Sequence, residues 1–439
     1  MAGANRDDPW ELVRSLPMGR RVELADPAGR TWTGTVVPRG ESTGERVLQL
    51  KLDSGYTVGL RVEPTFRVTL LDPTPPSTPS LAADLGRPTP RAAAGPRVTL
   101  LTSGGTIASR VDYETGGVRP VKEERELLAF YPELETSAHV RVVPVIDRLS
   151  EDISPDDWKL LAEHVVRAFA DGAHGVVIAH GTDTLAFTAA ALSFLLVDLP
   201  GPVVLVGAQR SPDRPSSDGA SNLAAAVRVA RDGEFGEVVV VMHAALSDGR
   251  YAIHRGTWVR KMHSSRRDAF ESRNGPPLGF VDPTGLRMEV ALRAAAGGPP
   301  RVDGPLGRDG GLLWSYPGME PERAEAFARE LKGLVIAGTG LGHVSSAHLE
   351  WIRRAVDRGT VVAMTTQCLE GNADPFVYST GRELQRAGVV YLGDLLPEVA
   401  YVKLLWALGH AADRRAVEAL LLSDVAGEFH WRHLAAGEL

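Results

Sequence analysis

Residues 20–71 alternate apolar and polar positions in short runs that are separated by turn-forming residues. Alternation with a period of two predicts β-strands that are buried on one face. Asp26–Gly29 and Asp53–Gly55 supply turn residues between the runs. The pattern predicts strands at 22–24, 31–37, 47–52, 57–62 and 66–70. Five short strands in so short a segment predict a small β-barrel.

Further along the chain the pattern changes to continuous apolar runs, such as 98–101 and 176–179. Runs of this kind are typical of parallel strands that are buried on both faces. They alternate with helix-length stretches at 155–170, 187–196 and 220–231. A second series predicts strands at 334–336 and 361–364 and helices at 346–356 and 397–408. Strands that alternate with helices predict parallel sheets covered by helices.

Two segments rich in proline or glycine separate the regions that show these patterns. Seven prolines occur from Asp72 to Pro96, where few bulky apolar side chains are available to form a core. A glycine- and proline-rich interval at 297–311 separates the two α/β series. We therefore expect an α/β protein with a two-domain core and parallel sheets, preceded by a small β-barrel. The expected units are a barrel (1–75), a linker (76–96), a large α/β domain (97–305) and a smaller one (306–439).

Composition narrows the classes of function. The chain has 439 residues, a formal net charge of −7 and one cysteine, Cys368. A negative balance argues against a protein that holds nucleic acid through its own basic surface. A single cysteine excludes an intrachain disulfide. The first residues are polar and no run approaches the roughly 20 apolar residues that span a bilayer, so we expect a cytoplasmic protein without a membrane anchor.

Two short motifs follow the apolar runs of the large α/β domain. Thr102–Ala108 contains Gly104-Gly105-Thr106, and His180–Thr184 contains His180-Gly181-Thr182-Asp183. Both follow expected strands, and ligands bind at the carboxyl ends of the strands in open α/β sheets. The motifs therefore place two threonine hydroxyls in one crevice. A threonine needs a proton acceptor to act as a nucleophile, and Asp183 and Lys261 are the candidates.

Each candidate residue also has an ordinary structural interpretation. Thr106 lies in a sequence that could form a plain turn, and Asp183 could cap a helix. Lys261 could be a surface lysine in a basic loop, and His180 is expected to be structural. His343 and Cys368 are expected to be packing residues or wall residues of the second α/β domain, with neither a metal nor a nucleophilic role assigned to them. No Gly-x-Gly-x-x-Gly or phosphate-binding Gly-Lys-Ser/Thr motif follows the relevant strands, which argues against ATP chemistry in this chain.

Taken together, these motifs resemble the L-asparaginase and glutaminase type amidohydrolases. The resemblance rests on the two threonine motifs, on Lys261, and on Ser150-Glu151-Asp152 followed by Trp158. The segments 207–211 and 217–222 resemble a further loop of the family. The resemblance implies an asparaginase-like α/β core in which Thr106 attacks the side-chain amide and releases ammonia. Thr182, Asp183 and Lys261 would form a second catalytic group. Tyr113 would be the tyrosine of a mobile lid, hydrogen-bonded to the nucleophile.

The same resemblance implies how the substrate is held. Ser150 and Glu151 would bind its α-carboxylate and α-amine, with backbone N–H groups near Gly105 and Gly181 completing the pocket. The family's glutamate from near the second-subunit boundary has no match in this sequence. The preference between glutamine and asparagine depends on one methylene, worth only about 1–3 kcal/mol, and residue types do not decide it.

One branch of the family fits best, the GatD chains of the archaeal glutamyl-tRNA(Gln) amidotransferase. The motifs that carry this resemblance lie at 261–270, 338–344, 367–368, 377–382 and 396–406. It implies an amidohydrolase that releases ammonia from glutamine or asparagine. A partner protein of the same amidotransferase, GatE, would bind ATP and Mg²⁺ and use the ammonia to convert Glu-tRNA(Gln) to Gln-tRNA(Gln).

The branch also implies an assembly. This chain would hold no cofactor or metal of its own, would form a homodimer within a heterotetramer, and would contact the tRNA through GatE. The N-terminal barrel would dock to that partner. Two alternatives remain open at this point: a free-standing cytoplasmic L-asparaginase with an added barrel, and a non-catalytic protein that binds a small ligand.

Overall fold

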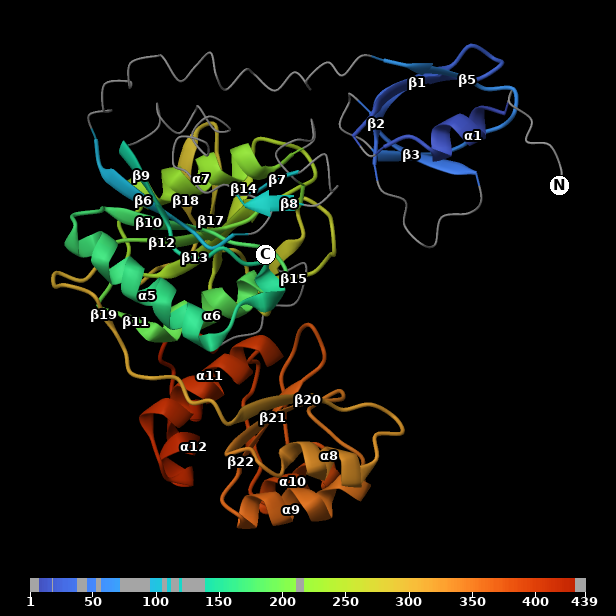
Figure 1. Cartoon of the computed structure of the whole chain (residues 1–439). Helices are drawn as coiled ribbons and strands as arrows, with labels where there is room; N and C mark the ends of the chain where they lie inside the picture. The colour runs from blue at the N-terminus through green and yellow to red at the C-terminus, as the bar shows by residue number, and fades with distance from the viewer. Residues whose placement is uncertain are drawn as a thin grey trace.

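The computed structural model describes residues 8–17, 19–37, 46–52, 57–71, 95–104, 109–111, 118–120, 139–210 and 217–430. Its elements are shown in Figure 1. No helix among these residues is long and apolar enough to cross a membrane.

The N-terminal part is an antiparallel sheet with one short helix. Its elements are α1 (Pro9–Arg14), β1 (Arg21–Ala25), β2 (Thr31–Val36), β3 (Val47–Leu52), β4 (Thr57–Arg61) and β5 (Arg67–Leu70). The strand order is β4-β3-β2-β1-β5, so β4 and β5 lie at the two ends of the sheet. Alternate strand residues such as Val22, Leu24 and Leu50 are buried around Trp10 and Val13 of α1. The five strands predicted from the alternating pattern are confirmed.

The large α/β domain contains an eight-stranded mixed sheet. Five neighbouring strands are parallel: β9 (His139–Pro144), β6 (Arg97–Thr102), β10 (Gly175–Ala179), β12 (Val203–Val206) and β13 (Val238–His243). The sheet continues with three antiparallel strands: β14 (Tyr251–Arg255), β17 (Gly279–Asp282) and β18 (Gly285–Met288). The pattern predicted a parallel sheet, and the antiparallel half differs because short connections such as 244–250 cannot make the crossover that parallel strands need.

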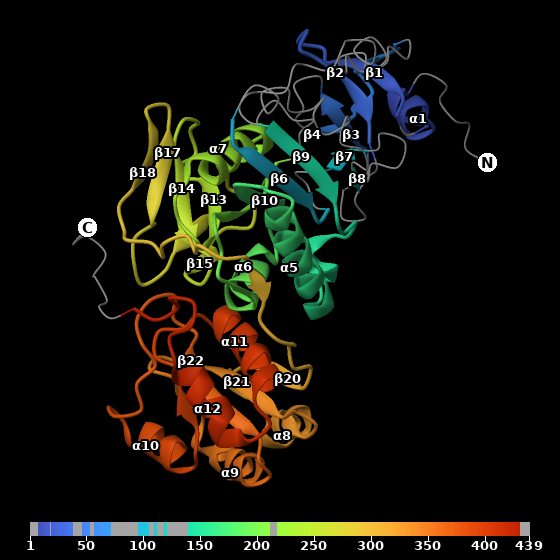
Figure 2. The ribbon, with the colours of Figure 1, turned by 90° about the vertical axis from the view of Figure 1, so that its left-hand side faces the viewer.

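Helices cover both faces of this sheet (Figures 1 and 2). Helices α5 (Pro155–Ala170) and α6 (Leu185–Leu195) pack on the face that presents Val176 and Ile178. Helix α7 (Gly219–Asp232) packs on the opposite face, which presents Val177 and Ala179. Alternate residues of β10 are therefore buried on opposite sides, which explains why the strand reads as a continuous apolar run.

The small α/β domain contains a parallel sheet of four strands. These are β20 (Gly310–Trp314), β21 (Gly333–Gly338), β22 (Val361–Thr366) and β23 (Val390–Tyr391). Its helices are α8 (Pro321–Ala328), α9 (Leu349–Asp357), α10 (Ser379–Arg386), α11 (Pro397–His410) and α12 (Arg414–Leu422). Helix α11 packs against α6, so the two domains share one apolar core. The predicted fold class, an α/β core preceded by a small N-terminal β domain, is confirmed. The described strands of that domain, predicted to form a barrel, make an antiparallel sheet in which β4 and β5 are not paired with each other.

Short elements complete the described chain. Three two-stranded ladders join β7 (Ser109–Val111) to β8 (Val118–Pro120), β11 (Leu196–Val197) to β19 (Arg301–Val302), and β15 (Val259–Lys261) to β16 (Phe270–Ser272). Two 3₁₀ turns are η2 (Ser150–Asp152) and η3 (Ser346–His348). The hairpin of β15 and β16 carries Lys261, and η2 carries Ser150 and Glu151.

Candidate active site

The two threonine motifs leave neighbouring parallel strands at the same edge of the large sheet. Ala179, the last residue of β10, lies in register with Thr102, the last residue of β6. The backbone N–H of Ser103 donates to the carbonyl of Ala179 at 3.0 Å, so the first motif begins directly beside the second. Thr106 and Gly105 (within 105–108) and Tyr113 (within 112–117) lie outside the described residues.

Thr182, Asp183 and Lys261 come together at this edge. The Nζ atom of Lys261 lies 2.9 Å from Oγ1 of Thr182 and 2.6 Å from Oδ1 of Asp183. Only 15% of the Lys261 side chain is exposed, against 67% for Asp183. The Asp183 carboxylate therefore balances the ammonium charge and fixes its position next to the threonine hydroxyl.

These contacts decide between the alternatives for two of the residues. Lys261 is not a free surface lysine, because its amine is held between Thr182 and Asp183. Asp183 does not cap α6, because the N-cap residue of that helix is Thr184. The hydroxyl of Thr184 instead donates to the carbonyl of Ser150 at 2.6 Å and ties the second motif to η2.

Close backbone approach brings the Ser150 turn against the second motif. A Cβ atom at Gly181 would lie 2.7 Å from Cβ of Ser150, which is closer than two carbon atoms can pack. Gly104, which has a φ of 89°, likewise lies against the carbonyl oxygen of Arg148. Ser150 is buried and Glu151 is exposed. Of the predicted substrate-binding residues, Ser150 and Gly181 thus pack against each other, and Glu151 follows Ser150 in η2.

His180 is buried beneath the crevice and takes part in a directed chain of hydrogen bonds. Its Nδ1 lies 2.7 Å from the carbonyl oxygen of Gly181, which can only accept, so Nδ1 carries the proton. Its Nε2 therefore accepts from the hydroxyl of Thr188 at 2.9 Å, and that hydroxyl accepts from Nε1 of Trp158 at 3.0 Å. Burial lowers the pKa of His180 to about 4. The histidine is neutral at pH 7 and orients the peptide group that precedes Thr182.

Gly207 forms the wall behind Thr182. It directly follows β12, and a Cβ atom there would lie 2.7 Å from Cγ2 of Thr182 and 3.0 Å from the carbonyl oxygen of His180. The carbonyl of Gly207 accepts a hydrogen bond from Nδ2 of Asn222 at 3.0 Å. Gly207 therefore confines the methyl group of Thr182, while Lys261 is hydrogen-bonded to its hydroxyl.

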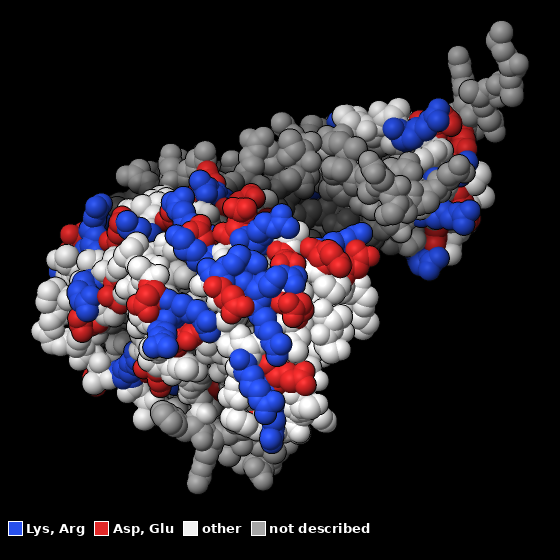
Figure 3. All heavy atoms as spheres, turned by 90° about the horizontal axis from the view of Figure 1, so that it is seen from below, with Lys and Arg blue, Asp and Glu red and all other residues white. Residues whose placement is uncertain are grey.

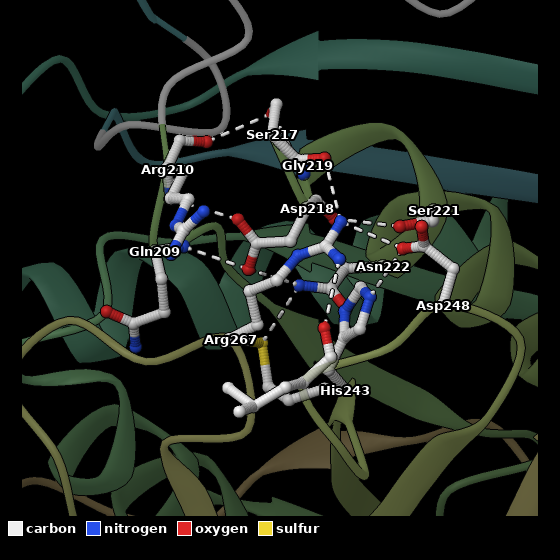
Figure 4. A network of polar contacts seen from close by, with 12 residues as sticks. Gln209, Arg210, Ser217, Asp218, Gly219, Ser221, Asn222, His243, Asp248 and Arg267 are labelled. Carbon is white, nitrogen blue, oxygen red and sulfur yellow. Dashed lines mark hydrogen bonds and ion pairs between the residues drawn. The ribbon is translucent and has the colours of Figure 1, made fainter. Parts of the chain in front are cut away.

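A polar network joins the 207–210 and 217–222 segments to residues that the sequence left unassigned (Figure 4). The sequence gives no reason to assign a role to His243, Asp248 or Arg267. Asp218, which is fully buried, accepts hydrogen bonds from the backbone N–H groups of Gln209 and Arg210. The polar cluster at 217–222, ahead of a helix, is the available signal, but its partners come from distant loops.

In the described part of the chain, no three His, Cys, Asp or Glu side chains are grouped to hold a metal ion. The amine of Lys261 is bound by the hydroxyl of Thr182 and the carboxylate of Asp183. Such an arrangement suits acyl transfer through a hydroxyl nucleophile with proton transfer to a neighbouring base.

Comparison with known proteins agrees with this chemistry. Family models match residues 16–71 (GatD N-terminal domain), 97–293 (asparaginase, N-terminal) and 311–421 (glutaminase/asparaginase C-terminal domain). The GatD chain of the glutamyl-tRNA(Gln) amidotransferase from Methanopyrus kandleri is 45% identical over 97% of this chain and 95% of the relative. The corresponding chain from Saccharolobus islandicus is 45% identical over 89% of this chain and 88% of the relative.

Solved structures of asparaginases share the fold of the α/β part. The thermostable L-asparaginase from Thermococcus kodakarensis superposes with a TM-score of 0.69 at 34% identity, over 76% of this chain and all of the asparaginase. L-asparaginase I from Vibrio cholerae gives a TM-score of 0.66 at 28% identity, over 77% of this chain and all of the enzyme. The chain thus belongs to the GatD family of the glutamyl-tRNA(Gln) amidotransferases, in which an asparaginase-type amidohydrolase core follows an N-terminal GatD domain.

Proposed function

We propose that this chain releases ammonia from glutamine or asparagine and supplies it for the ATP-dependent conversion of Glu-tRNA(Gln) to Gln-tRNA(Gln) by a GatE partner. The observation that carries the proposal is the Thr182–Asp183–Lys261 group, with Nζ of Lys261 2.9 Å from the threonine hydroxyl. Membership of the GatD family supports the role in tRNA-dependent amidation.

In the proposed reaction, the hydroxyl oxygen of Thr106 attacks the carbonyl carbon of the substrate's side-chain amide. The bond between that carbon and the amide nitrogen breaks, and the nitrogen leaves as ammonia with the proton from the hydroxyl. The product is an ester between the substrate acyl group and Thr106. Water then attacks the ester, which releases the free acid and restores the threonine.

In this scheme the proton transfers are assigned to the group of Thr182, Asp183 and Lys261. Lys261 is hydrogen-bonded to the hydroxyl of Thr182. The first motif begins beside the second, because the backbone N–H of Ser103 donates to the carbonyl of Ala179. We assign to Thr182 and Lys261 the transfer of a proton to and from the attacking group, and to Asp183 the placement of the amine. Tyr113 is assigned to the lid over Thr106.

Substrate binding is assigned to the turn that packs against the second motif. Ser150 and Glu151 would take the α-carboxylate and α-amine, and backbone N–H groups of Gly105 and Gly181 would complete the pocket. The close packing of Ser150 against Gly181 supports this placement. We propose no cofactor for this chain and assign ATP and Mg²⁺ to GatE, in the cytoplasm where aminoacyl-tRNA is made.

The charge distribution supports contact with tRNA through the partner. The chain has a net charge of −7, and Lys and Arg are interspersed with Asp and Glu on the face shown in Figure 3. A protein that binds the tRNA phosphate backbone by itself usually presents a continuous basic surface. We propose a homodimer of this chain with GatE bound outside it, which together make a heterotetramer.

We further propose that residues 1–75 dock GatE, that 76–96 link this unit to the catalytic part, and that 97–305 and 306–439 are the large and small α/β domains. Deletion of residues 1–75 is expected to weaken assembly with GatE and to leave ammonia release intact. Analytical ultracentrifugation of the mixture checks this. Normal assembly of the truncated chain would disprove the docking role.

The function itself is tested by measuring ammonia release from glutamine and asparagine, by the chain alone and with GatE, Glu-tRNA(Gln) and ATP. We expect release that depends on Thr106 and Lys261 and that rises when the partner and tRNA are present. Equally strong release by the chain alone would instead indicate a free-standing L-asparaginase. A chain that binds either amide without releasing ammonia in any mixture would be a ligand-binding protein.

A further inference from the structure

Arg267 joins its own loop to the loops that follow β12 and β13; Ser217 and Asp248 of those loops are labelled beside it in Figure 4. Its Nη2 atom lies 2.8 Å from Oδ1 of Asp248 and donates to the carbonyl of Ser217 at 3.2 Å. Its Nη1 atom donates to the carbonyl of Leu246 at 3.2 Å. Ser217 lies beyond β12, and Leu246 and Asp248 follow β13. The side chain is 12% exposed, so this guanidinium fills the space between the loops.

From Asp248 the contacts continue inward to the wall behind Thr182. Oδ1 of Asp248 lies 3.1 Å from Nε2 of His243, and Nδ1 of that histidine lies 2.6 Å from Oδ1 of Asn222. Nδ2 of Asn222 donates to the carbonyl of Gly207 at 3.0 Å. His243 and Asn222 are completely buried. A continuous chain of polar contacts therefore connects Arg267 to the residue that confines the methyl group of Thr182.

Arg267 is also connected along the chain to Lys261, whose amine contacts the hydroxyl of Thr182. Arg267 lies in the loop that joins β15 to β16, and Lys261 is the last residue of β15. Lys261 is paired with Phe270, and the loop is closed by a hydrogen bond from Met262 N to Ala269 O at 2.6 Å. Arg267 is therefore a near neighbour along the chain of the lysine whose amine contacts Thr182. Movement of this loop would move Lys261.

We propose that Arg267 is a positioning residue: by binding the loops after β12 and β13, it holds Lys261 against the hydroxyl of Thr182 and the Gly207 wall against its methyl group. This inference rests on the proposed function of Thr182 and Lys261. The contact at stake is the 2.9 Å hydrogen bond between Nζ of Lys261 and Oγ1 of Thr182. A displacement of about 1 Å in a reacting group can lower the rate about a hundredfold.

The neighbouring arginine provides a matched control. Arg266 lies in the same loop and pairs with Asp268 of that loop at 2.5 and 2.9 Å, so its contacts stay within the hairpin. We compare Arg267→Gln, Arg267→Lys and Arg266→Gln by kcat and KM for ammonia release and by thermal unfolding. Arg267→Gln is expected to lower kcat about ten- to a hundredfold with KM changed less than about threefold.

The two other variants define the effect further. Arg266→Gln is expected to keep kcat within about twofold, since it removes a contact inside one loop. Arg267→Lys keeps a cation beside Asp248 but lacks the planar fork that reaches two carbonyl groups, so its kcat should fall between the wild type and Arg267→Gln. Equal effects of Arg267→Gln and Arg266→Gln, or a change in KM alone, would overturn the positioning role.

A second measurement follows the position of Lys261 without using activity. An amine-reactive acylating reagent is applied to the folded chain, and peptides are quantified by mass spectrometry. Arg267→Gln is expected to speed labelling of Lys261 several-fold, whereas Lys159, whose side chain is 55% exposed on α5, serves as the unchanged reference. Unchanged labelling of Lys261 in a folded variant would overturn the proposal. Absence of ammonia release from the wild type would instead refute the proposed function, and the labelling result would still decide the role of Arg267.

Discussion

Substitution of Gly207 by alanine tests how closely activity depends on the position of Thr182. The added Cβ would lie 2.7 Å from Cγ2 of Thr182 and 3.0 Å from the carbonyl oxygen of His180. Carbon atoms pack at about 3.5–4.0 Å, so the threonine methyl must move by roughly 1 Å. Oγ1 and Cγ2 share one Cβ, so the hydroxyl is displaced together with the methyl group, and its 2.9 Å contact with Nζ of Lys261 is disturbed.

A displacement of this size predicts a fall in kcat of about a hundredfold, with an overpacking cost of about 1–3 kcal/mol in the free energy of unfolding. The assay is steady-state ammonia release together with denaturant unfolding. Gly310→Ala is a matched control, because its Cβ would lie 2.6 Å from Cδ2 of Leu405 in the small domain. That variant is expected to keep its kcat and to lose less stability, because the end of a leucine side chain can shift more easily than the carbonyl of His180.

A second substitution tests whether kcat falls because of the clash with the methyl group of Thr182 or because the fold as a whole is disturbed. Thr182→Ser keeps the hydroxyl and removes the methyl group that the new Cβ would contact. The double variant Gly207→Ala/Thr182→Ser is therefore expected to recover to within about fivefold of Thr182→Ser alone. A kcat for Gly207→Ala within about threefold of the wild type, or a double variant as slow as Gly207→Ala, would refute the reasoning.

Two further predictions concern buried charge. Nζ of buried Lys403 lies 2.6 Å from Oε1 of buried Glu428, so Lys403→Met would leave a buried carboxylate without its cationic partner, although the backbone N–H groups of Val425 and Ala426 still donate to it. The substitution should cost about 3 kcal/mol in urea unfolding, and a loss below about 1 kcal/mol would contradict this. Burial lowers the pKa of His180 to about 4, so the unfolded chain binds a proton between pH 4 and 6.5 that the folded chain does not. Stability should therefore rise with pH across this window, by about 3 kcal/mol more in the wild type than in His180→Gln; parallel profiles of the two proteins would rule this out.

Much of the fold could be predicted because its signals are local. The strands at 47–52 and the helix at 155–170 coincide with β3 and α5, since periodicity and turn residues mark their ends. The antiparallel half of the large sheet was missed because a strand's direction depends on its neighbours rather than on its own sequence. The short helices α8 and α10, with few apolar residues each, gave weak patterns.

In the active site, too, residues that belong to one sequence motif could be predicted, whereas residues brought together only by folding could not. Thr182 and Asp183 belong to one motif, and Lys261 could be added through the family resemblance. No role could be assigned to Arg267 from the sequence, because the carbonyl groups to which it donates hydrogen bonds lie 21 and 50 residues away along the chain. A basic loop read along the sequence looks like a solvated surface, and only the folded chain shows that one of its arginines is nearly buried.

The central claim is that Thr182, held by Lys261, takes part in the release of ammonia from an amide side chain. The most direct test compares ammonia release from asparagine and glutamine by the wild type and by Thr182→Val, which keeps the shape of the side chain and removes the hydroxyl. We expect measurable release by the wild type and a loss of at least about a thousandfold in the variant, with both proteins folded. Equal release by the two proteins would contradict the account.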